Sequence, residues 1–493
     1  MKFERSSGVL LHPTSLPGRY GIGDLGPSAY QFIDWLFDAG CKLWQILPLG
    51  PTGYGDSPYQ CFSAFAGNPY LISPDFLMRD DLLHPDDLTG IPEFSNDEVD
   101  YGRLIPWKLN LLERAFIRFK SAPRPVHQEY ERFCAENVSW LPDYALFMAL
   151  KEANGGGAWD GWPEALRKRE SDAIAEAGKR HADAVARFTF YQFAFFRQWV
   201  AVREHALQRG LQIIGDIPIF VAYDSADVWA NPDLFYLGED GKPSAVAGVP
   251  PDYFSETGQL WGNPLYRWDV LKAREYDWWV ARFRAILKQV DIVRLDHFRG
   301  FAGYWEIPAG SKTAETGRWA TGPGEDFFTS VESALGELPL IAEDLGEITP
   351  DVIELRDQFN LPGMKILQFA FSDPENKFLP HNYQAQCVTY TGTHDNDTAR
   401  GWYESAPEHE RDFARRYLDT DGSDFSWQLT RSAWASVAVY ALAPMQDLLG
   451  LGTEARMNFP SKLGGNWCWR LLPEQLDSDL QSRLKELNYL YRR

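Results

Sequence analysis

The sequence predicts a (β/α)8 barrel, an α/β fold, with large segments inserted in the loops of the barrel. Short apolar runs recur along the 493 residues and alternate with helical stretches, a pattern typical of βαβ units and a parallel sheet. Several runs end in an acidic residue, as a buried strand with a carboxylate at its C-terminal tip does. The chain is also longer than a minimal barrel of roughly 250 residues, which leaves room for insertions.

Eight short segments rich in apolar and β-branched residues are the predicted barrel strands. In chain order they are Val9–His12, Leu43–Pro48, Leu211–Asp216, Asp291–Asp296, Leu338–Glu343, Met364–Phe371, Cys387–Thr393 and Ala435–Leu442. In a barrel of this kind the C-terminal tips of all strands face one pocket, where the chemistry of the fold takes place. The acidic residues that end these segments are therefore expected to lie close together.

Uneven spacing of the strands predicts two insertions within a single catalytic barrel that spans residues 1–493. Well over a hundred residues separate the second strand from the third, so we expect an inserted subdomain over residues 50–210. It is loop-rich at first and helical from Pro163 to Gly210. A second insertion, rich in Gly, Pro, Asp and aromatic residues, is expected over residues 222–276. Loops of that length in a compact protein usually form lids or binding walls.

The composition argues against a nucleic acid or a membrane surface as the partner. The formal net charge is -21, with 48 basic and 69 acidic residues, and such a chain repels phosphate backbones and anionic lipids. A neutral sugar meets no such repulsion. Aromatic residues make up 15% of the chain, and we expect most of them in the core and a minority on a sugar cleft.

Cysteine usage and the N-terminal segment predict a cytoplasmic protein. The five cysteines are widely spaced and form no CxxC pair, so they indicate neither a disulfide framework nor a zinc site. This pattern is typical of proteins in a reducing compartment. The first residues show no signal-peptide pattern, and no apolar run reaches the roughly 20 residues that a membrane span needs.

Several carboxylates in one pocket, without a phosphate or metal motif, indicate chemistry at glycosidic bonds. Arg294 and Asp296 are two residues apart on a strand, so their side chains share one face. A guanidinium beside a carboxylate keeps it anionic, as a nucleophile requires, although a structural ion pair at the barrel mouth remains an alternative. Glu343 has apolar flanks that favour a raised pKa, as a general acid needs. The alternative for Glu343 is a carboxylate at a helix N-terminus.

The strand-end sequence Thr393–Asp397 contains one histidine and two acids. A metal site is one interpretation, but no other histidine stands at ligand spacing and the HExxH motif is absent. A carboxylate, Asp395, that stabilises a transition state beside a hydrogen-bonding His394 fits the pattern better. Asp216 ends a strand and is followed by a turn, so it is expected at the same pocket.

Seven motifs, in order, resemble those of the 4-alpha-glucanotransferases of glycoside hydrolase family 77. They are Leu10–Pro17, Ser57–Gln60, Gly248–Gly262, Val293–Gly300, Ile341–Gly346, Thr391–Thr398 and Met457–Pro460. The resemblance implies a barrel of the α-amylase clan. It also implies retaining transfer of α-1,4-glucan segments from a maltooligosaccharide, starch or glycogen-type glucan to the 4-hydroxyl of an acceptor glucose or maltooligosaccharide.

The resemblance also implies a role for each matching residue. Asp296 is the expected nucleophile, which forms a covalent glycosyl-aspartate, Glu343 the acid/base and Asp395 the transition-state stabiliser. The expected sugar-binding residues are Tyr59, Asp216, Gln259, Trp261, Arg294, His297, His394 and Asn466. The aromatic loop around Tyr253, Phe254 and Trp261 is expected to exclude water from the acceptor side. No metal and no organic cofactor are expected.

Two other functions remain open at the level of sequence. The first is a plain α-glucan hydrolase of the same clan, which would raise the number of reducing ends during the reaction. The second is a catalytically silent glycan-binding or regulatory protein. The presence of all three acids, Asp296, Glu343 and Asp395, speaks against a silent protein.

Overall fold

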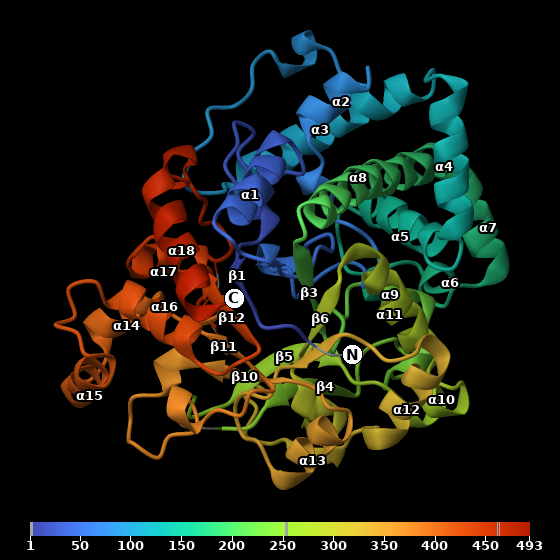
Figure 1. The fold of residues 1–493 in the computed structure, drawn as a ribbon. Helices are drawn as coiled ribbons and strands as arrows, with labels where there is room; N and C mark the ends of the chain where they lie inside the picture. The colour runs from blue at the N-terminus through green and yellow to red at the C-terminus, as the bar shows by residue number, and fades with distance from the viewer. Residues whose placement is uncertain (1–2, 252–254, 461, 463) are drawn as a thin grey trace.

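A closed barrel of eight parallel strands forms the centre of the molecule (Figure 1). The computed structural model describes residues 3–251, 255–460, 462 and 464–493. The strands are β1 (Ser6–Leu10), β2 (Leu43–Gln45), β3 (Gln212–Pro218), β6 (Ile292–Asp296), β9 (Leu340–Ala342), β10 (Gly363–Ile366), β11 (Cys387–Tyr390) and β12 (Tyr440–Pro444). They follow one another around the barrel as β1-β12-β11-β10-β9-β6-β3-β2. The predicted fold class is thereby confirmed.

The observed strand boundaries differ from the predicted segments, for example at the first and the last strand. The first strand runs from Ser6 to Leu10 and not from Val9 to His12, because two buried serines extend it and Pro13 begins a 3-10 turn after it. The last strand begins only at Tyr440, since the helix α16 (Phe425–Ala435) already includes Ala435. Small apolar residues suit a helix and a buried strand equally, so their pattern did not separate the two elements.

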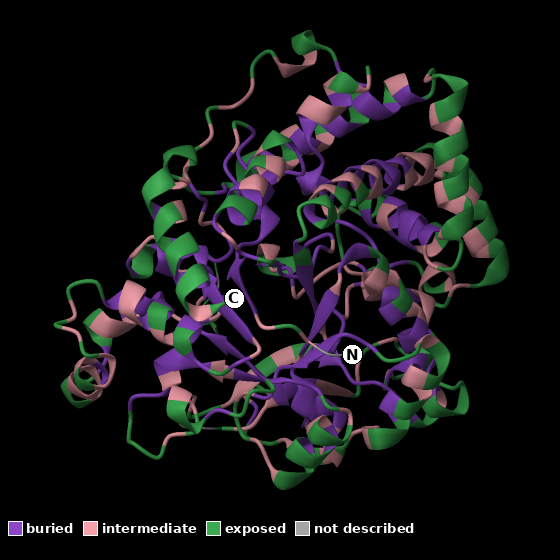
Figure 2. Ribbon diagram, in the orientation of Figure 1, coloured by how far each residue is buried: buried purple, intermediate pink, exposed green. Residues whose placement is uncertain are grey.

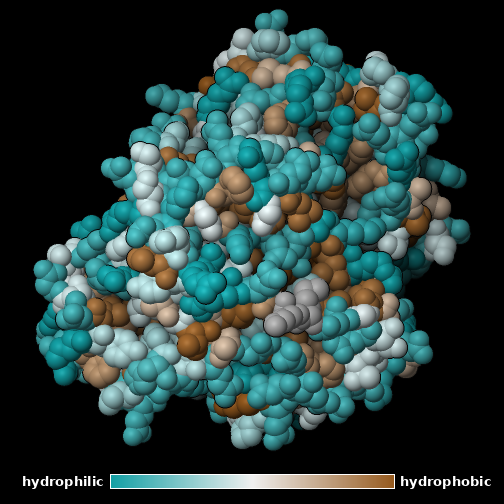
Figure 3. Space-filling model, in the orientation of Figure 1, coloured by the Kyte–Doolittle hydropathy of each residue, from teal (hydrophilic) through white to brown (hydrophobic). Residues whose placement is uncertain are grey.

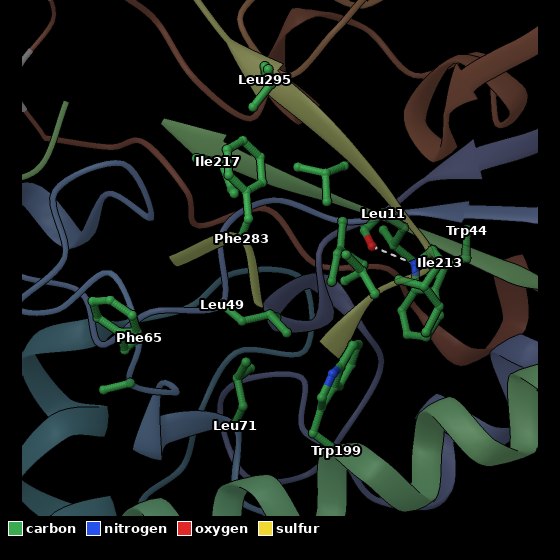
Figure 4. Close-up of a cluster of buried hydrophobic side chains, with 14 of the residues drawn as sticks. Leu11, Trp44, Leu49, Phe65, Leu71, Trp199, Ile213, Ile217, Phe283 and Leu295 are labelled. Carbon is green, nitrogen blue, oxygen red and sulfur yellow. Dashed lines mark hydrogen bonds between the residues drawn. The ribbon is translucent and has the colours of Figure 1, made fainter. Parts of the chain in front are cut away.

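Apolar side chains of the strands fill the interior of the barrel. Leu43, Ile214, Ile292, Ile341, Met364, Ile366, Val388, Tyr390, Tyr440 and Leu442 form this inner cluster. A larger apolar cluster packs the outside of the strands against the helices, so that the buried residues lie at the centre of Figure 2. In Figure 4, Trp199 points from its helix towards Ile213, and the indole of Trp44 donates a hydrogen bond of 2.8 Å to the carbonyl oxygen of Leu11.

Seven helices lie between β2 and β3, within the predicted insertion. They are α2 (Pro74–Arg79), α3 (Tyr101–Phe119), α4 (Arg124–Glu136), α5 (Leu141–Ala153), α6 (Glu164–Arg167), α7 (Ser171–Arg180) and α8 (Ala182–Gln208). Two glutamines of α8 fix the loop that follows β2: Gln192 and Gln198 each exchange two hydrogen bonds with the backbone of Gly67 and Ser73. That residues 50–210 form a separate subdomain stays a prediction.

A four-stranded antiparallel sheet lies beside the barrel, with the order β5-β4-β7-β8. The second predicted insertion, residues 222–276, contributes β4 (Ala245–Val249) and β5 (Gln259–Pro264), together with α9 (Ala226–Ala230) and α10 (Trp268–Ala273). The other half of the sheet comes from β7 (Gly303–Pro308) and β8 (Arg318–Thr321), which follow β6. The sheet therefore connects this insertion to the segment directly after β6.

The remaining helices surround the barrel. They are α1 (Pro27–Asp38), α11 (Asp277–Gln289), α12 (Gly324–Leu335), α13 (Pro350–Gln358), α14 (Ala399–Ser405), α15 (Glu408–Leu418), α17 (Met445–Leu448) and α18 (Ser478–Tyr491). Across the described residues we find no helix with both the length and the apolar character needed to cross a bilayer. The face shown in Figure 3 is mostly hydrophilic, with small apolar patches.

Candidate active site

The tips of the neighbouring strands β3 and β6 bring one arginine between two carboxylates. The strand register places Asp216 opposite Arg294. The Nη1 atom of Arg294 lies 2.6 Å from Oδ2 of Asp216 and 2.9 Å from Oδ1 of Asp296. Burial alone would lower the pKa of Arg294, but the two carboxylates outweigh it and raise that pKa, so the guanidinium stays charged.

The two carboxylates around Arg294 differ in their access to solvent. The side chain of Asp216 is 0% exposed, whereas that of Asp296 is 27% exposed. Asp296 is therefore accessible from outside the protein while Arg294 holds one of its oxygens. This combination of an ionic partner and an open face is what a nucleophilic carboxylate needs.

Asp216 has one carboxylate oxygen for which the described part of the chain provides no hydrogen-bond partner. Its Oδ2 accepts hydrogen bonds from Tyr59 Oη, at 2.9 Å, and from Arg294, while its Oδ1 is buried and has no hydrogen-bond partner among the described residues. Burial raises the pKa of Asp216, and Arg294 opposes that rise. Since buried polar atoms are nearly always hydrogen-bonded, Oδ1 of Asp216 is suited to accept a hydrogen bond from a hydroxyl of a bound ligand.

Glu343 follows β9 and is held by backbone donors from two loops. The N–H of His297 donates to its Oε2 at 2.7 Å, and the N–H of Leu345 donates to its Oε1 at 2.9 Å. His297 reaches it because its backbone adopts the left-handed conformation, with φ of 52°. Burial, with a contribution from Asp296, raises the pKa of Glu343 to about 7. Glu343 is thus poised to hold or release a proton near neutral pH.

Trp261, which belongs to the aromatic loop predicted on the acceptor side, contacts this site through the ring of His297. The ring of Trp261 meets the ring of His297 edge to face, with centroids 4.8 Å apart. The indole N–H of Trp261 donates to Oε1 of Gln259 at 3.1 Å, so the two β5 side chains are linked. Burial lowers the pKa of His297 to about 3, which keeps its ring neutral. Tyr253 and Phe254, which the sequence assigned to the same loop, lie outside the described residues.

His394 and Asp395 follow β11 on the opposite side of Tyr59. The ring of Tyr59 stacks on that of His394, with centroids 5.1 Å apart, while its hydroxyl donates to Asp216. Burial lowers the pKa of His394. Asp395 is more open, with 49% of its side chain exposed, and its Oδ2 lies 3.4 Å from Nε2 of His394. Tyr59 therefore connects the two halves of the candidate site.

Asn466, a predicted sugar contact, uses its side chain within its own loop. Its Oδ1 accepts from the N–H of Phe459 at 3.0 Å, and its Nδ2 donates to the carbonyl of Lys462 at 2.9 Å. One amide hydrogen of Asn466 is left over by these two bonds. The residue lies next to the site through its neighbour Trp467, which packs on Tyr59.

Two residues that sequence reasoning did not single out contact this site directly. Trp467 packs against both Tyr59 and His394, at centroid distances of 5.9 Å. Asn458 donates a hydrogen bond of 2.7 Å to Oδ1 of Asp395. The available signal was positional, because Asn458 lies inside the motif Met457–Pro460 and Trp467 directly follows Asn466. In the described part of the chain no three His, Cys, Asp or Glu side chains gather as a metal site requires.

Comparison with known proteins identifies close relatives over nearly the full chain. The family profile that describes 4-alpha-glucanotransferases, glycoside hydrolase family 77, matches residues 11–475. The 4-alpha-glucanotransferase of Thermus thermophilus is 53% identical, over 99% of this chain and 99% of the relative. The chloroplastic/amyloplastic 4-alpha-glucanotransferase of Solanum tuberosum is 46% identical, over 98% of this chain and 85% of its own length.

Solved structures agree with the sequence relatives. The amylomaltase from Streptococcus agalactiae in complex with acarbose is 40% identical and superposes with a TM-score of 0.97, covering 99% of this chain and 100% of that chain. The amylomaltase from Corynebacterium glutamicum shares the fold with a TM-score of 0.81 at 18% identity, covering 98% of this chain and 75% of that chain.

Proposed function

We propose a retaining covalent mechanism for this chain, on the premise that it belongs to glycoside hydrolase family 77, the 4-alpha-glucanotransferases. The chain is accordingly a 4-alpha-glucanotransferase. The donor is a maltooligosaccharide or a starch- or glycogen-type α-1,4-glucan, and the acceptor is the 4-hydroxyl of glucose or a maltooligosaccharide. One observation carries the mechanism: the open carboxylate Asp296 and the buried Glu343, with its pKa near 7, end adjacent strands.

In the first step the carboxylate of Asp296 attacks the anomeric carbon of the donor. The glycosidic C–O bond breaks, and Glu343 gives its proton to the leaving oxygen. The product is a glycosyl ester on Asp296. In the second step ionised Glu343 takes the proton of the acceptor 4-hydroxyl, whose oxygen attacks the same carbon and releases Asp296.

The surrounding residues hold the sugar at the cleavage point. We assign Oδ1 of Asp216 to a ring hydroxyl, supported by its burial without a hydrogen-bond partner in the part of the chain that the structure describes. Asp395, half exposed beside His394, binds hydroxyls of the distorted ring more tightly in the oxocarbenium-like state. Arg294, His297 and Tyr59 orient these acids, and Gln259, Trp261 and Asn466 are assigned to further sugar contacts.

Incubation with maltotriose tests the transfer reaction. The chain is expected to produce glucose and a ladder of longer maltooligosaccharides, while the total concentration of reducing ends stays constant. Each transfer breaks one glycosidic bond and forms another, which is why the number of ends does not change. A reducing-sugar assay together with chromatography of the products checks both statements. A steady rise in reducing ends would identify a hydrolase instead, and no change in the sugars would indicate a glycan-binding protein.

Exclusion of water on the acceptor side is assigned to Trp261, which touches His297 beside Glu343. Trp261→Ala is expected to raise the ratio of hydrolysis to transfer by about 10-fold, because water then reaches the glycosyl ester more easily. The number of new reducing ends per molecule of released glucose measures the ratio of hydrolysis to transfer. Leu260→Ala is the matched control, since Leu260 is the neighbouring β5 residue, is 41% exposed and points to the other face of the strand. An equal ratio of hydrolysis to transfer in both variants would contradict the assignment of water exclusion to Trp261.

The location and the excluded partners stay predictions. We propose a cytoplasmic enzyme without a nucleic-acid or membrane partner, supported by the net charge of -21 and by five cysteines that are all free.

A further inference from the structure

The segment Arg456–Phe459 contacts His394 and Asp395 through three hydrogen bonds. Nη2 of Arg456 donates to the carbonyl oxygen of Asp395 at 2.6 Å. The N–H of Asn458 donates to the carbonyl oxygen of His394 at 3.1 Å. The side-chain Nδ2 of Asn458 donates to Oδ1 of Asp395 at 2.7 Å. Both the backbone and the carboxylate of Asp395 are therefore held from this one segment.

Asp395 needs such support because its own surroundings leave it open. Its side chain is 49% exposed, and its contact with His394 Nε2, at 3.4 Å, is longer than a strong charge-assisted hydrogen bond. The bond from Asn458 is the one contact shorter than 3 Å that the Asp395 side chain makes within the described ranges. Without it the carboxylate gains rotamer freedom that must be lost again in the transition state.

The segment is itself braced, so it can act as a fixed support. Nε of Arg456 donates to the carbonyl of Asn458 at 2.7 Å, and the guanidinium lies over the ring of Phe459, 4.5 Å from the centroid. The N–H of Trp467 donates to the carbonyl of Met457 at 2.7 Å. The side chain of Asn466 accepts from Phe459, as described above. Asn458 thus lies between a segment held by several hydrogen bonds and the open carboxylate of Asp395.

We propose that Asn458 is a positioning residue of the transfer reaction, which aims the carboxylate of Asp395 at the sugar through its side-chain amide. This inference rests on the proposed role of Asp395 as transition-state stabiliser. The amide occupies one lone pair of Oδ1 and leaves Oδ2, with the remaining lone pairs, to the hydroxyls of the distorted ring. Arg456 supports the same residue through the backbone carbonyl.

Asn458→Ala removes the donor and is expected to lower kcat by about 10- to 100-fold, the factor that one hydrogen bond to a charged group represents. KM for maltotriose should change by less than about threefold, because the lost interaction matters in the transition state more than in the ground state. Asn458→Asp has the same shape but no amide donor, so it should lose at least as much. An unchanged melting temperature of Asn458→Asp would show that the variant keeps its fold.

Thr453→Val is the matched control on the same loop. Thr453 Oγ1 donates a bond of 2.9 Å to Oδ2 of Asp397, a carboxylate two residues after Asp395. Its removal should leave kcat within about twofold of the unchanged enzyme, since Asp397 is not part of the proposed chemistry. A loss of kcat equal to that of Asn458→Ala would show that the loop, and not the amide of Asn458, matters.

A double-mutant cycle separates positioning from general destabilisation. In an Asp395→Ala background, Asn458→Ala should cause no further loss of kcat, measured with the activated donor α-maltotriosyl fluoride. A full additional loss in that background, or an unchanged kcat for the single variant, would overturn the inference while leaving the proposed function intact. If Asp395→Ala itself retains kcat, the role proposed for Asp395 fails and the inference falls with it.

Discussion

Replacement of Asp296 by alanine is expected to reduce kcat for glucan transfer by about 10⁴-fold or more, because the proposed mechanism forms the glycosyl ester on Asp296. Asp296 is the carboxylate that combines an arginine at 2.9 Å with an open face, whereas Asp216 on the same arginine is fully buried. The side chain lies at the end of β6 and is partly exposed, so the variant should keep its fold. Initial rates of maltotriose disproportionation measure the effect.

Direct capture of the ester provides the complementary evidence. With a 5-fluoro-α-glucosyl fluoride donor, the unchanged enzyme should gain the mass of one fluoroglucosyl group, located on the peptide that contains Asp296. Asp296→Ala should not gain this mass. Asp357→Ala serves as control, because Asp357 is a carboxylate that pairs with an arginine at 2.6 Å outside the pocket and is 59% exposed. A label on another side chain would reassign the nucleophile.

Strand-end acids were predictable from the sequence because the signal is local. A short β-branched run, a carboxylate at its end and a helical stretch after it all lie within a few residues of Asp216, Asp296 and Glu343. Barrel topology then requires these tips to converge, which gave the candidate site before any coordinates. The helices α6, α7 and α8 lie in the stretch predicted as helical, Pro163–Gly210, whereas α2 to α5 precede that stretch and were not predicted.

Contacts that join distant segments were not predictable in this way. Tyr59 and Asp216 are 157 residues apart, and Asn458 and Asp395 are 63 residues apart. The sheet formed by β4 and β7 joins two segments on either side of β6, and no short turn connects these strands that could set their register. Even the raised pKa of Glu343 depends on burial by residues far along the chain.

Glu343→Gln is expected to lower kcat/KM for maltotriose by about 10²- to 10⁴-fold, the usual contribution of a positioned acid. For the unchanged enzyme, kcat/KM should fall as the pH rises through about 7, because Glu343 must be protonated to act and its pKa is raised to about that value by burial. The glutamine variant should lose this basic limb of the profile. A limb that persists unchanged in Glu343→Gln would belong to another group.

The stereochemistry of azide rescue then distinguishes the two acids, because each variant leaves a different face of the sugar open. With α-maltotriosyl fluoride, which needs no proton to release fluoride, Glu343→Gln should still form the ester on Asp296. Azide, which needs no general base, displaces Asp296 and yields the α-glycosyl azide by two inversions. Asp296→Ala has no ester to form, so azide attacks the donor itself and yields the β-glycosyl azide. Proton NMR of the anomeric hydrogen separates these products, and β-azide from Glu343→Gln would contradict the roles assigned to both residues.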